Sequence, residues 1–182
     1  MDENTVLPDE IAQLARRVVE ANHEAGRTIA LAESCTGGLV AAALTEIPGS
    51  SAVLDRGYVT YSNEAKMDAL GVSSEIIETF GAVSIACVWS MAKGALDRSG
   101  ADVAVAISGI AGPGGGSDLK PVGTVVFARV ERDRIGKPDG ELRQFDGASR
   151  SEVRRQATIC ALELLLPDQE EAEAAPGADS SP

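Results

Sequence analysis

The chain has 182 residues, a net charge of -12 and one histidine. This length is typical of one domain with a substantial hydrophobic core. The acidic balance argues against nucleic-acid binding driven by neutralisation of phosphates. Because His23 is the only histidine, a zinc site with several histidines is excluded, and a Ser-His-Asp hydrolase would have to use His23.

The cysteines indicate neither a metal site nor a disulfide framework. Cys35, Cys87 and Cys160 lie far apart, without a CxxC pair or the spacing of metal ligands. This usage is typical of a reducing compartment, and we expect the cytoplasm. The acidic residues 1–10 do not resemble a signal peptide, and no apolar run approaches the ~18 residues of a membrane span. We therefore expect a protein that binds neither nucleic acid nor membranes and holds no metal.

The hydrophobic spacing alternates between helical and extended periods along most of the chain. In chain order, the expected elements are a helix over 10–25, a strand over 28–33, a helix over 39–47, a strand over 57–61, helices over 63–70, 73–80 and 84–98, strands over 101–110, 122–130 and 141–145, and a helix over 150–166. This order predicts α/β layers with a mixed sheet. We expect a flexible start over 1–8, one domain over 9–167 and an acidic disordered tail over 168–182.

The loop after the first expected strand, residues 33–38, places a serine before a helix that opens with two glycines. Ser34 is either an ordinary helix cap or a nucleophile beside unpaired backbone N–H groups. Those groups, from Cys35 to Gly38, could hold an oxyanion or a phosphate. We expect Cys35 to be a small buried side chain, because no base is available to activate its thiol.

Lys66 has two interpretations. If Ser62 caps the helix that starts at Asn63, Lys66 lies near the positive end of that helix. That field, and burial, would lower the lysine pKa and make the neutral amine a competent general base. The alternative is a solvated lysine that pairs with Glu64 or Asp68.

Three further features are ambiguous when each is taken alone. The glycine-rich stretch 109–117 allows close approach of the backbone to a ligand, but it is neither a GxGxxG motif nor a P-loop. Arg154 and Arg155 on the last helix either grip a phosphate or offset surface charge. Trp89 is expected to pack beside the apolar stripe of its helix rather than to stack on a ligand.

Four segments taken together resemble the CinA C-terminal family. They are Ala32-Glu33-Ser34-Cys35-Thr36-Gly37-Gly38, Gly57-Tyr58-Val59-Thr60-Tyr61-Ser62-Asn63-Glu64-Ala65-Lys66, Ser108-Gly109-Ile110-Ala111-Gly112-Pro113 and Lys120-Pro121-Val122-Gly123-Thr124. The resemblance covers about residues 11–166 and implies a single-domain three-layer α/β/α fold. It also implies hydrolysis of the carboxamide of nicotinamide mononucleotide to nicotinate mononucleotide and ammonia, by a serine and a lysine, without a metal or other cofactor.

The resemblance also implies roles for individual residues. Ser34 would be the nucleophile and Lys66 the base, with Tyr61 assisting, and N–H groups near Thr36 to Gly38 would stabilise the oxyanion. The residues expected to bind substrate are Thr36, Gly37, Gly38, Ser108, Gly109, Gly112 and Arg154, with Arg155 as the alternative to Arg154. Ser108 stands where the family can carry threonine, so a hydroxyl is retained.

Two other functions remain open from the sequence. One is a non-catalytic interaction module linked to competence or DNA damage, and the other is an amidase for a related pyridine amide. Retention of Ser34, Tyr61 and Lys66 together favours an enzyme, since a binding module has no need of all three. The apolar face of residues 84–98 is either core or the interface of a homo-oligomer.

Overall fold

The computed structural model describes residues 5–134 and 139–168. Its centre is a five-stranded mixed sheet in the order β2-β1-β3-β4-β5. The strands are β1 (Ile29–Glu33), β2 (Leu54–Val59), β3 (Val103–Gly109), β4 (Thr124–Glu131) and β5 (Asp139–Gln144). β1 pairs in parallel with β2 and β3, whereas β4 is antiparallel to both β3 and β5. The expected mixed sheet is confirmed.

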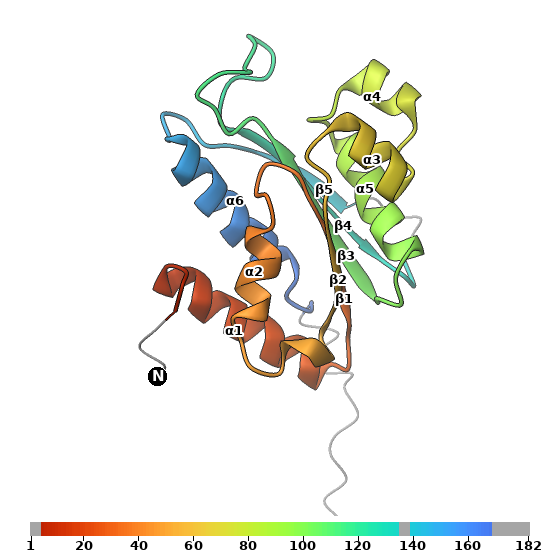
Figure 1. Cartoon of the computed structure of the whole chain (residues 1–182), viewed down its shortest axis with the longest axis vertical. Helices are drawn as coiled ribbons and strands as arrows, with labels where there is room; N and C mark the ends of the chain where they lie inside the picture. Colours follow the sequence, from red (N-terminus) through yellow and green to blue (C-terminus); the bar gives the residue numbers. More distant parts are fainter. Residues whose placement is uncertain (1–4, 135–138, 169–182) are drawn as a thin grey trace, which may run out of the picture.

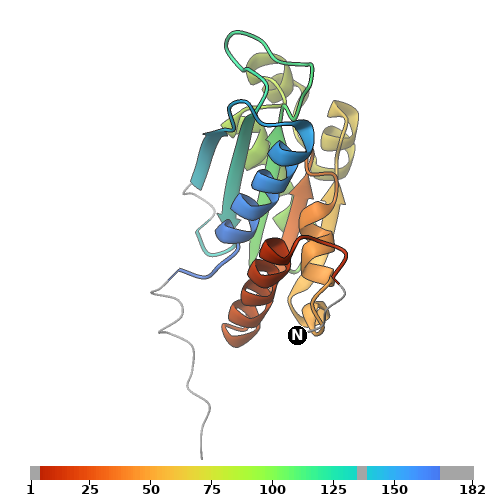
Figure 2. The same cartoon turned by 90° about the vertical axis from the view of Figure 1, so that its left-hand side faces the viewer.

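Helices cover both faces of this sheet (Figure 1). On one face lie α1 (Asp9–Glu24), α2 (Leu39–Thr45) and α6 (Arg150–Leu164), which Figure 2 shows from the front. On the other face lie α3 (Asn63–Leu70), α4 (Ser74–Phe80) and α5 (Ile85–Asp97), and a short 3-10 turn, η1 (Ser50–Ala52), precedes β2. The expected three-layer α/β/α architecture is confirmed.

Each face of the sheet has its own hydrophobic core, because successive side chains of a strand point to opposite faces. In β1, Ile29 and Leu31 join the core under α1, α2 and α6, while Ala30 and Ala32 join the core under α3, α4 and α5. All five residues of β1 are buried. Burial on both faces explains why this strand forms a continuous apolar run in the sequence rather than an alternating one.

The parallel strands β1, β2 and β3 bring their carboxyl ends to one edge of the sheet. The chain leaves β1 through α2 on one face, and leaves β2 through α3, α4 and α5 on the other. β1 and β3 are neighbours in the sheet, and the chain continues from β1 to β2 on one side of this pair and from β3 to β4 on the other, so a crevice opens beyond their ends. In open α/β sheets, ligands bind at such a switch point.

Each expected helix and strand forms, and the differences lie at their ends. The largest difference concerns β2, expected over 57–61 and observed over Leu54–Val59. β2 is an edge strand with most of its side chains exposed, so its hydrophobic pattern marks its limits poorly. The apolar side of α5 is core, and Trp89 packs against that core as expected.

Nothing in the described ranges, 5–134 and 139–168, is a helix long and apolar enough to cross a bilayer. The expectations for the first residues and for the tail fall largely on 1–4 and 169–182, which lie outside the described residues. Asp168, the first residue of the expected tail, is described and forms an ion pair with Arg129 at 3.0 Å.

Candidate active site

A cavity of about 290 Å³ lies beyond the carboxyl ends of β1 and β3. Its walls come from the loop after β1, the start of α3, the end of β3, the glycine-rich loop that follows, and the first residue of α6. Ser34, Tyr61, Lys66 and Ser108 all line it. Residues far apart in the sequence therefore meet at the switch point of the sheet.

The side chains of Ser34 and Lys66 are in direct contact. The Nζ atom of Lys66 lies 3.1 Å from Ser34 Oγ and donates to the carbonyl oxygens of Thr60 at 2.8 Å and Ser62 at 3.4 Å. Lys66 is only 1% exposed, although it belongs to α3, one of the outer helices that cover the sheet. The interpretation of Lys66 as a solvated surface lysine is therefore wrong.

Burial lowers the pKa of Lys66 below its ordinary value of 10.5, because an ammonium group loses hydration away from water. The thiols of Cys87 and Cys35 and the carboxylate of Glu64 act in the opposite direction with smaller effect. Burial also raises the pKa of the Cys35 thiol to about 11. Burial thereby increases the neutral fraction of the amine beside the serine hydroxyl, while the neighbouring thiol stays protonated at neutral pH.

The start of α3 follows the prediction from the sequence. The Ser62 hydroxyl accepts from the backbone N–H of Ala65 at 3.0 Å, so Ser62 is the cap of this helix. Capping fixes the first turn, and Lys66 lies one turn into the helix, where its amine contacts Ser34 Oγ. The cap confirms the predicted helix start, and burial supplies the shift of the lysine pKa.

Glu33 has a structural role that the sequence analysis missed. Its buried carboxylate accepts from the backbone N–H groups of Gly38 at 3.0 Å, Val40 at 3.2 Å and Ala41 at 2.9 Å. It therefore satisfies the N–H groups at the start of α2, which a capping side chain ordinarily does. The interpretation of Ser34 as the helix cap is wrong, and its hydroxyl is left for Lys66.

The N–H groups after Ser34 divide into two pairs. The amide of Gly37 donates to the Ser34 carbonyl at 3.0 Å, and the amide of Gly38 donates to Glu33. These two amides are thus already bonded, which contradicts the expectation that they act as oxyanion donors. The amides of Cys35 and Thr36 instead act on the Cys35 thiol, whose pKa they lower, and Cys35 lines the cavity.

The far wall of the cavity is formed by Ser108, Gly109 and the start of the glycine-rich loop, as expected for residues that approach a ligand. Gly109 has no room for a side chain, because an added Cβ would lie 2.8 Å from Val125 Cγ2 and 3.1 Å from Cys35 Sγ. Gly112 adopts φ 84°, a conformation that favours glycine. Both glycines therefore set the shape of this wall.

The three arginines of α6 lie in different environments. Arg154 donates to the carbonyl oxygens of Cys35 at 3.2 Å and Thr36 at 3.1 Å, and it does not line the cavity. Arg155 pairs with Glu152 and Glu10. Neither residue lines the cavity.

Arg150, the first residue of α6, does line the cavity, and the sequence analysis missed it. Its guanidinium donates to the Gly112 carbonyl at 2.7 Å and to the Tyr61 hydroxyl at 2.8 Å. Tyr61, expected to assist catalysis, is thus held by Arg150, and no hydrogen bond joins its hydroxyl to Ser34 or Lys66. An arginine in a first helical turn opposes the helix dipole, which is a signal that could have drawn attention to Arg150.

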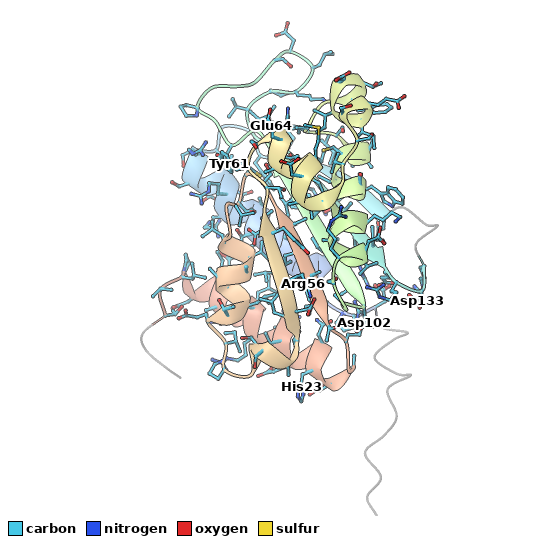
Figure 3. All side chains as sticks on the ribbon, turned by 45° about the vertical axis from the view of Figure 1, so that its right-hand side comes forward. His23, Arg56, Tyr61, Glu64, Asp102 and Asp133 are labelled. Carbon is cyan, nitrogen blue, oxygen red and sulfur yellow. The ribbon has the colours of Figure 1, made fainter. Side chains whose placement is uncertain are left out.

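His23 lies near the C-terminal end of α1, at the opposite end of the molecule from Tyr61 (Figure 3). A hydrolase built on Ser34 and His23 is therefore excluded by distance. Within the described ranges, no group of three or more His, Cys, Asp or Glu side chains is placed to hold a metal ion. Among the described side chains, the amine that contacts Ser34 Oγ is that of Lys66.

The sequence profile of the CinA C-terminal domain matches residues 11–168. This chain belongs to the CinA C-terminal domain family. It is 52% identical over 156 residues to nicotinamide-nucleotide amidohydrolase PncC of Escherichia coli K12, covering 86% of this chain and 93% of that protein. The corresponding PncC of Pseudomonas putida is 49% identical and covers 87% of this chain and 96% of its own length.

Other relatives in the CinA family are longer. The chain is 49% identical to a CinA-like protein of Mycolicibacterium gilvum, where the match covers 90% of this chain and 36% of that protein. Among solved structures, the competence/damage inducible protein CihA of Agrobacterium tumefaciens superposes with a TM-score of 0.85 at 50% identity, covering 89% of this chain and 97% of that one. The family therefore contains both short and long proteins that share this domain.

Proposed function

We propose that this chain hydrolyses the carboxamide of nicotinamide mononucleotide, with Ser34 as nucleophile and Lys66 as general base. The observation that carries the proposal is the buried amine of Lys66, 3.1 Å from the Ser34 hydroxyl in the wall of a cavity. The relatives named nicotinamide-nucleotide amidohydrolase supply the substrate. An activated serine beside a base is the arrangement that acyl transfer requires.

The two carbonyls around Lys66 explain how its amine would act as a base. A neutral amine has two N–H bonds and one lone pair. The carbonyl oxygens of Thr60 and Ser62 accept from Nζ and so occupy its N–H bonds. The lone pair of Nζ is then directed at Ser34 Oγ and can accept the hydroxyl proton.

In the first half of the reaction, Lys66 takes the hydroxyl proton while Ser34 Oγ forms a bond to the carboxamide carbon. The carbonyl oxygen gains negative charge, and the amides of Cys35 and Thr36 stabilise it. Lys66 then returns the proton to the amide nitrogen, the C–N bond breaks, and ammonia leaves. In the second half, Lys66 deprotonates a water that attacks the acyl-enzyme ester, which releases the nicotinate product and regenerates Ser34.

Arg150 and the glycine-rich loop are the proposed sites for the phosphate and ribose of the substrate. Arg150 lines the cavity and carries a permanent positive charge. Gly112 and the following glycines allow the backbone to approach a ligand closely. This assignment moves the expected phosphate contact from Arg154 to the first turn of α6, while Ser108 remains a candidate contact to the nicotinamide.

The proposal is tested by measuring ammonia release from nicotinamide mononucleotide by the wild type, Ser34→Ala and Lys66→Met. We expect Lys66→Met to lose about a hundredfold to ten-thousandfold in kcat, because a positioned general base contributes that much. Ser34→Ala loses at least as much. Lys93→Met, which removes an exposed lysine of α5 paired with Asp97, serves as control and keeps wild-type turnover. Wild-type turnover by folded Ser34→Ala would contradict the nucleophile assignment.

The substrate assignment is tested separately by comparing nicotinamide mononucleotide, nicotinamide riboside and nicotinamide. We expect the mononucleotide to have the highest kcat/KM, and Arg150→Ala to raise KM for it by about tenfold to a hundredfold, the value of one charged hydrogen bond. The riboside lacks the phosphate, so Arg150→Ala leaves its kcat/KM much less affected. If the wild type prefers the riboside or nicotinamide, the enzyme acts on a related pyridine amide instead.

A further inference from the structure

The backbone that follows Ser34 is held from two sides by charged groups. On the side of α2, the Glu33 carboxylate accepts from three amides. On the side of α6, the guanidinium of Arg154 spans two consecutive carbonyls, with Nε 3.2 Å from Cys35 O and Nη2 3.1 Å from Thr36 O. Arg154 is only partly buried, and neither contact serves the hydrogen bonding of its own helix.

The contact to Cys35 O also orients the N–H of Thr36, the other end of the same peptide unit. In a trans peptide unit, the carbonyl and the N–H of the next residue point in opposite directions. A guanidinium that holds the Cys35 carbonyl toward α6 therefore directs the Thr36 N–H away from α6. The Thr36 amide acts on the Cys35 thiol, whose pKa it lowers, and Cys35 is a residue of the cavity wall.

The contact to Thr36 O acts on the next peptide unit in the same way. Its N–H belongs to Gly37 and donates to the Ser34 carbonyl at 3.0 Å, which closes a tight turn directly after the nucleophile. The two carbonyls therefore determine both the orientation of the Thr36 amide and the turn that carries Ser34. A lysine could not reproduce this, since its single ammonium group lacks the planar fork of a guanidinium.

We propose that Arg154 is a positioning residue, which sets the peptide units after Ser34 so that the Thr36 amide faces the reacting carbonyl oxygen. This role rests on the proposed amidase activity and replaces the phosphate contact expected for Arg154. Arg154 acts through the loop and does not touch the substrate.

The decisive experiment measures kcat and KM for nicotinamide mononucleotide in Arg154→Lys and Arg154→Gln. We expect kcat to fall by about tenfold to a thousandfold, up to the loss that removal of one oxyanion donor causes, with KM changed by no more than about threefold. The matched control is Arg155→Gln on the same helix, whose guanidinium pairs with Glu152 and Glu10 and not with the loop. Both kinetic constants of this control stay near wild type.

Two results would overturn the positioning role. One is a KM that rises about tenfold with kcat unchanged, as a direct phosphate contact would give. The other is a kcat unchanged in both Arg154 variants. Thermal unfolding of each variant confirms that the enzyme is folded under the assay conditions.

A second measurement separates this role from the choice of substrate. An alkyl fluorophosphonate reacts with activated serines, and intact-mass spectrometry gives the rate at which it labels Ser34. We expect labelling to be slower in Arg154→Lys by at least about tenfold and unchanged in Arg155→Gln, because the developing negative charge on the phosphonyl oxygen needs the same amide. Equal rates would contradict the role of Arg154. Absence of ammonia release by the wild type, with the labelling pattern kept, would overturn the proposed substrate alone.

Discussion

At the scale of single residues, the site is built from polar side chains that folding buries away from water. Lys66 and Ser34 are ordinary polar residues in the sequence, and each is at least nine-tenths buried in the structure. Burial lowers the lysine pKa and raises that of the adjacent Cys35. The same physical effect therefore favours the neutral amine of Lys66 and disfavours the thiolate of Cys35.

The lowered pKa of Lys66 predicts the direction of the pH dependence. Below its pKa Lys66 is an ammonium group without a lone pair, so it cannot accept the Ser34 proton. We expect kcat/KM to rise with pH as the ammonium group ionises, with an inflection below the ordinary lysine pKa of 10.5. A series of steady-state assays in overlapping buffers measures it, and a flat profile up to pH 10.5 would contradict Lys66 as the base.

The raised pKa of Cys35 predicts that its thiol takes no part in catalysis. With a pKa of about 11, Cys35 is almost fully protonated at neutral pH, and the thiol form is a poor nucleophile. We expect Cys35→Ala to keep ammonia release within about tenfold of wild type, and iodoacetamide at neutral pH to leave Cys35 unmodified, as read by peptide mass spectrometry. Rapid alkylation of Cys35 with matching loss of activity would contradict this.

At the scale of elements, the loop that contains Ser34 leads into α2, and α3 carries Lys66. Each of these helices is held in place by one close contact. α2 is anchored by Glu33, which belongs to the preceding strand and not to the helix itself. α3 is anchored by Gly94 of α5, where an added Cβ would lie 2.0 Å from the carbonyl oxygen of Leu70. Substitution of Glu33 and of Gly94 therefore tests the two contacts.

Glu33→Gln tests the anchor of α2. A glutamine offers one acceptor oxygen and turns an NH₂ donor toward amides that themselves donate, so we expect a loss of about 1–3 kcal/mol in the free energy of unfolding. Chemical denaturation measures it. Glu78→Gln in α4 is the matched control, since Glu78 is exposed, and it stays within about 0.5 kcal/mol of wild type. Equal stability of the two variants would contradict the anchoring role.

Gly94→Ala tests the anchor of α3. Helix propensity alone predicts that alanine stabilises α5 by about 1 kcal/mol. The contact with Leu70 reverses this sign, and we expect a loss of at least about 1–3 kcal/mol from overpacking. At Gly100 an added Cβ meets nothing within 4 Å, so Gly100→Ala is the control and leaves the melting temperature nearly unchanged. A stabilised Gly94→Ala would show that α5 is free to move.

At the scale of the whole molecule, the order of the strands places the site. The parallel arrangement of β1, β2 and β3 gathers their carboxyl ends, and the divergence of the chain to the two sides of β1 and β3 opens the crevice there. His23, the only histidine of the sequence, falls at the other end of the molecule and does not line the cavity. The topology thus selects which of the polar residues can meet.

The composition of this crevice predicts that activity is independent of a dissociable metal. Within residues 5–134 and 139–168, no three potential ligands among His, Cys, Asp and Glu come together. We expect ammonia release to be the same before and after prolonged dialysis against EDTA. Loss of activity that is restored by adding back Zn²⁺ or Mg²⁺ would contradict this prediction.

The sequence by itself determined the layered α/β fold, the order of its elements and the identity of Ser34 and Lys66 as candidates. Local patterns suffice for the fold and for raising both residues as candidates, because hydrophobic periodicity and turn residues report on short stretches of chain. The cap by Ser62 is of this kind, since donor and acceptor are three residues apart. The roles of nucleophile and base are what the resemblance to the CinA C-terminal family implies.

Only the tertiary structure decided how these residues are used. The contact of Ser34 with Lys66 spans 32 positions, that of Arg154 with Cys35 spans 119, and that of Arg150 with Tyr61 spans 89. The role of Glu33 could not be predicted either, although its partners are close in sequence. Its carboxylate reaches the N–H groups of α2 only because β1, which carries it, packs beside that helix. Charge and burial depend on what packs around a side chain, and that is a property of the folded chain.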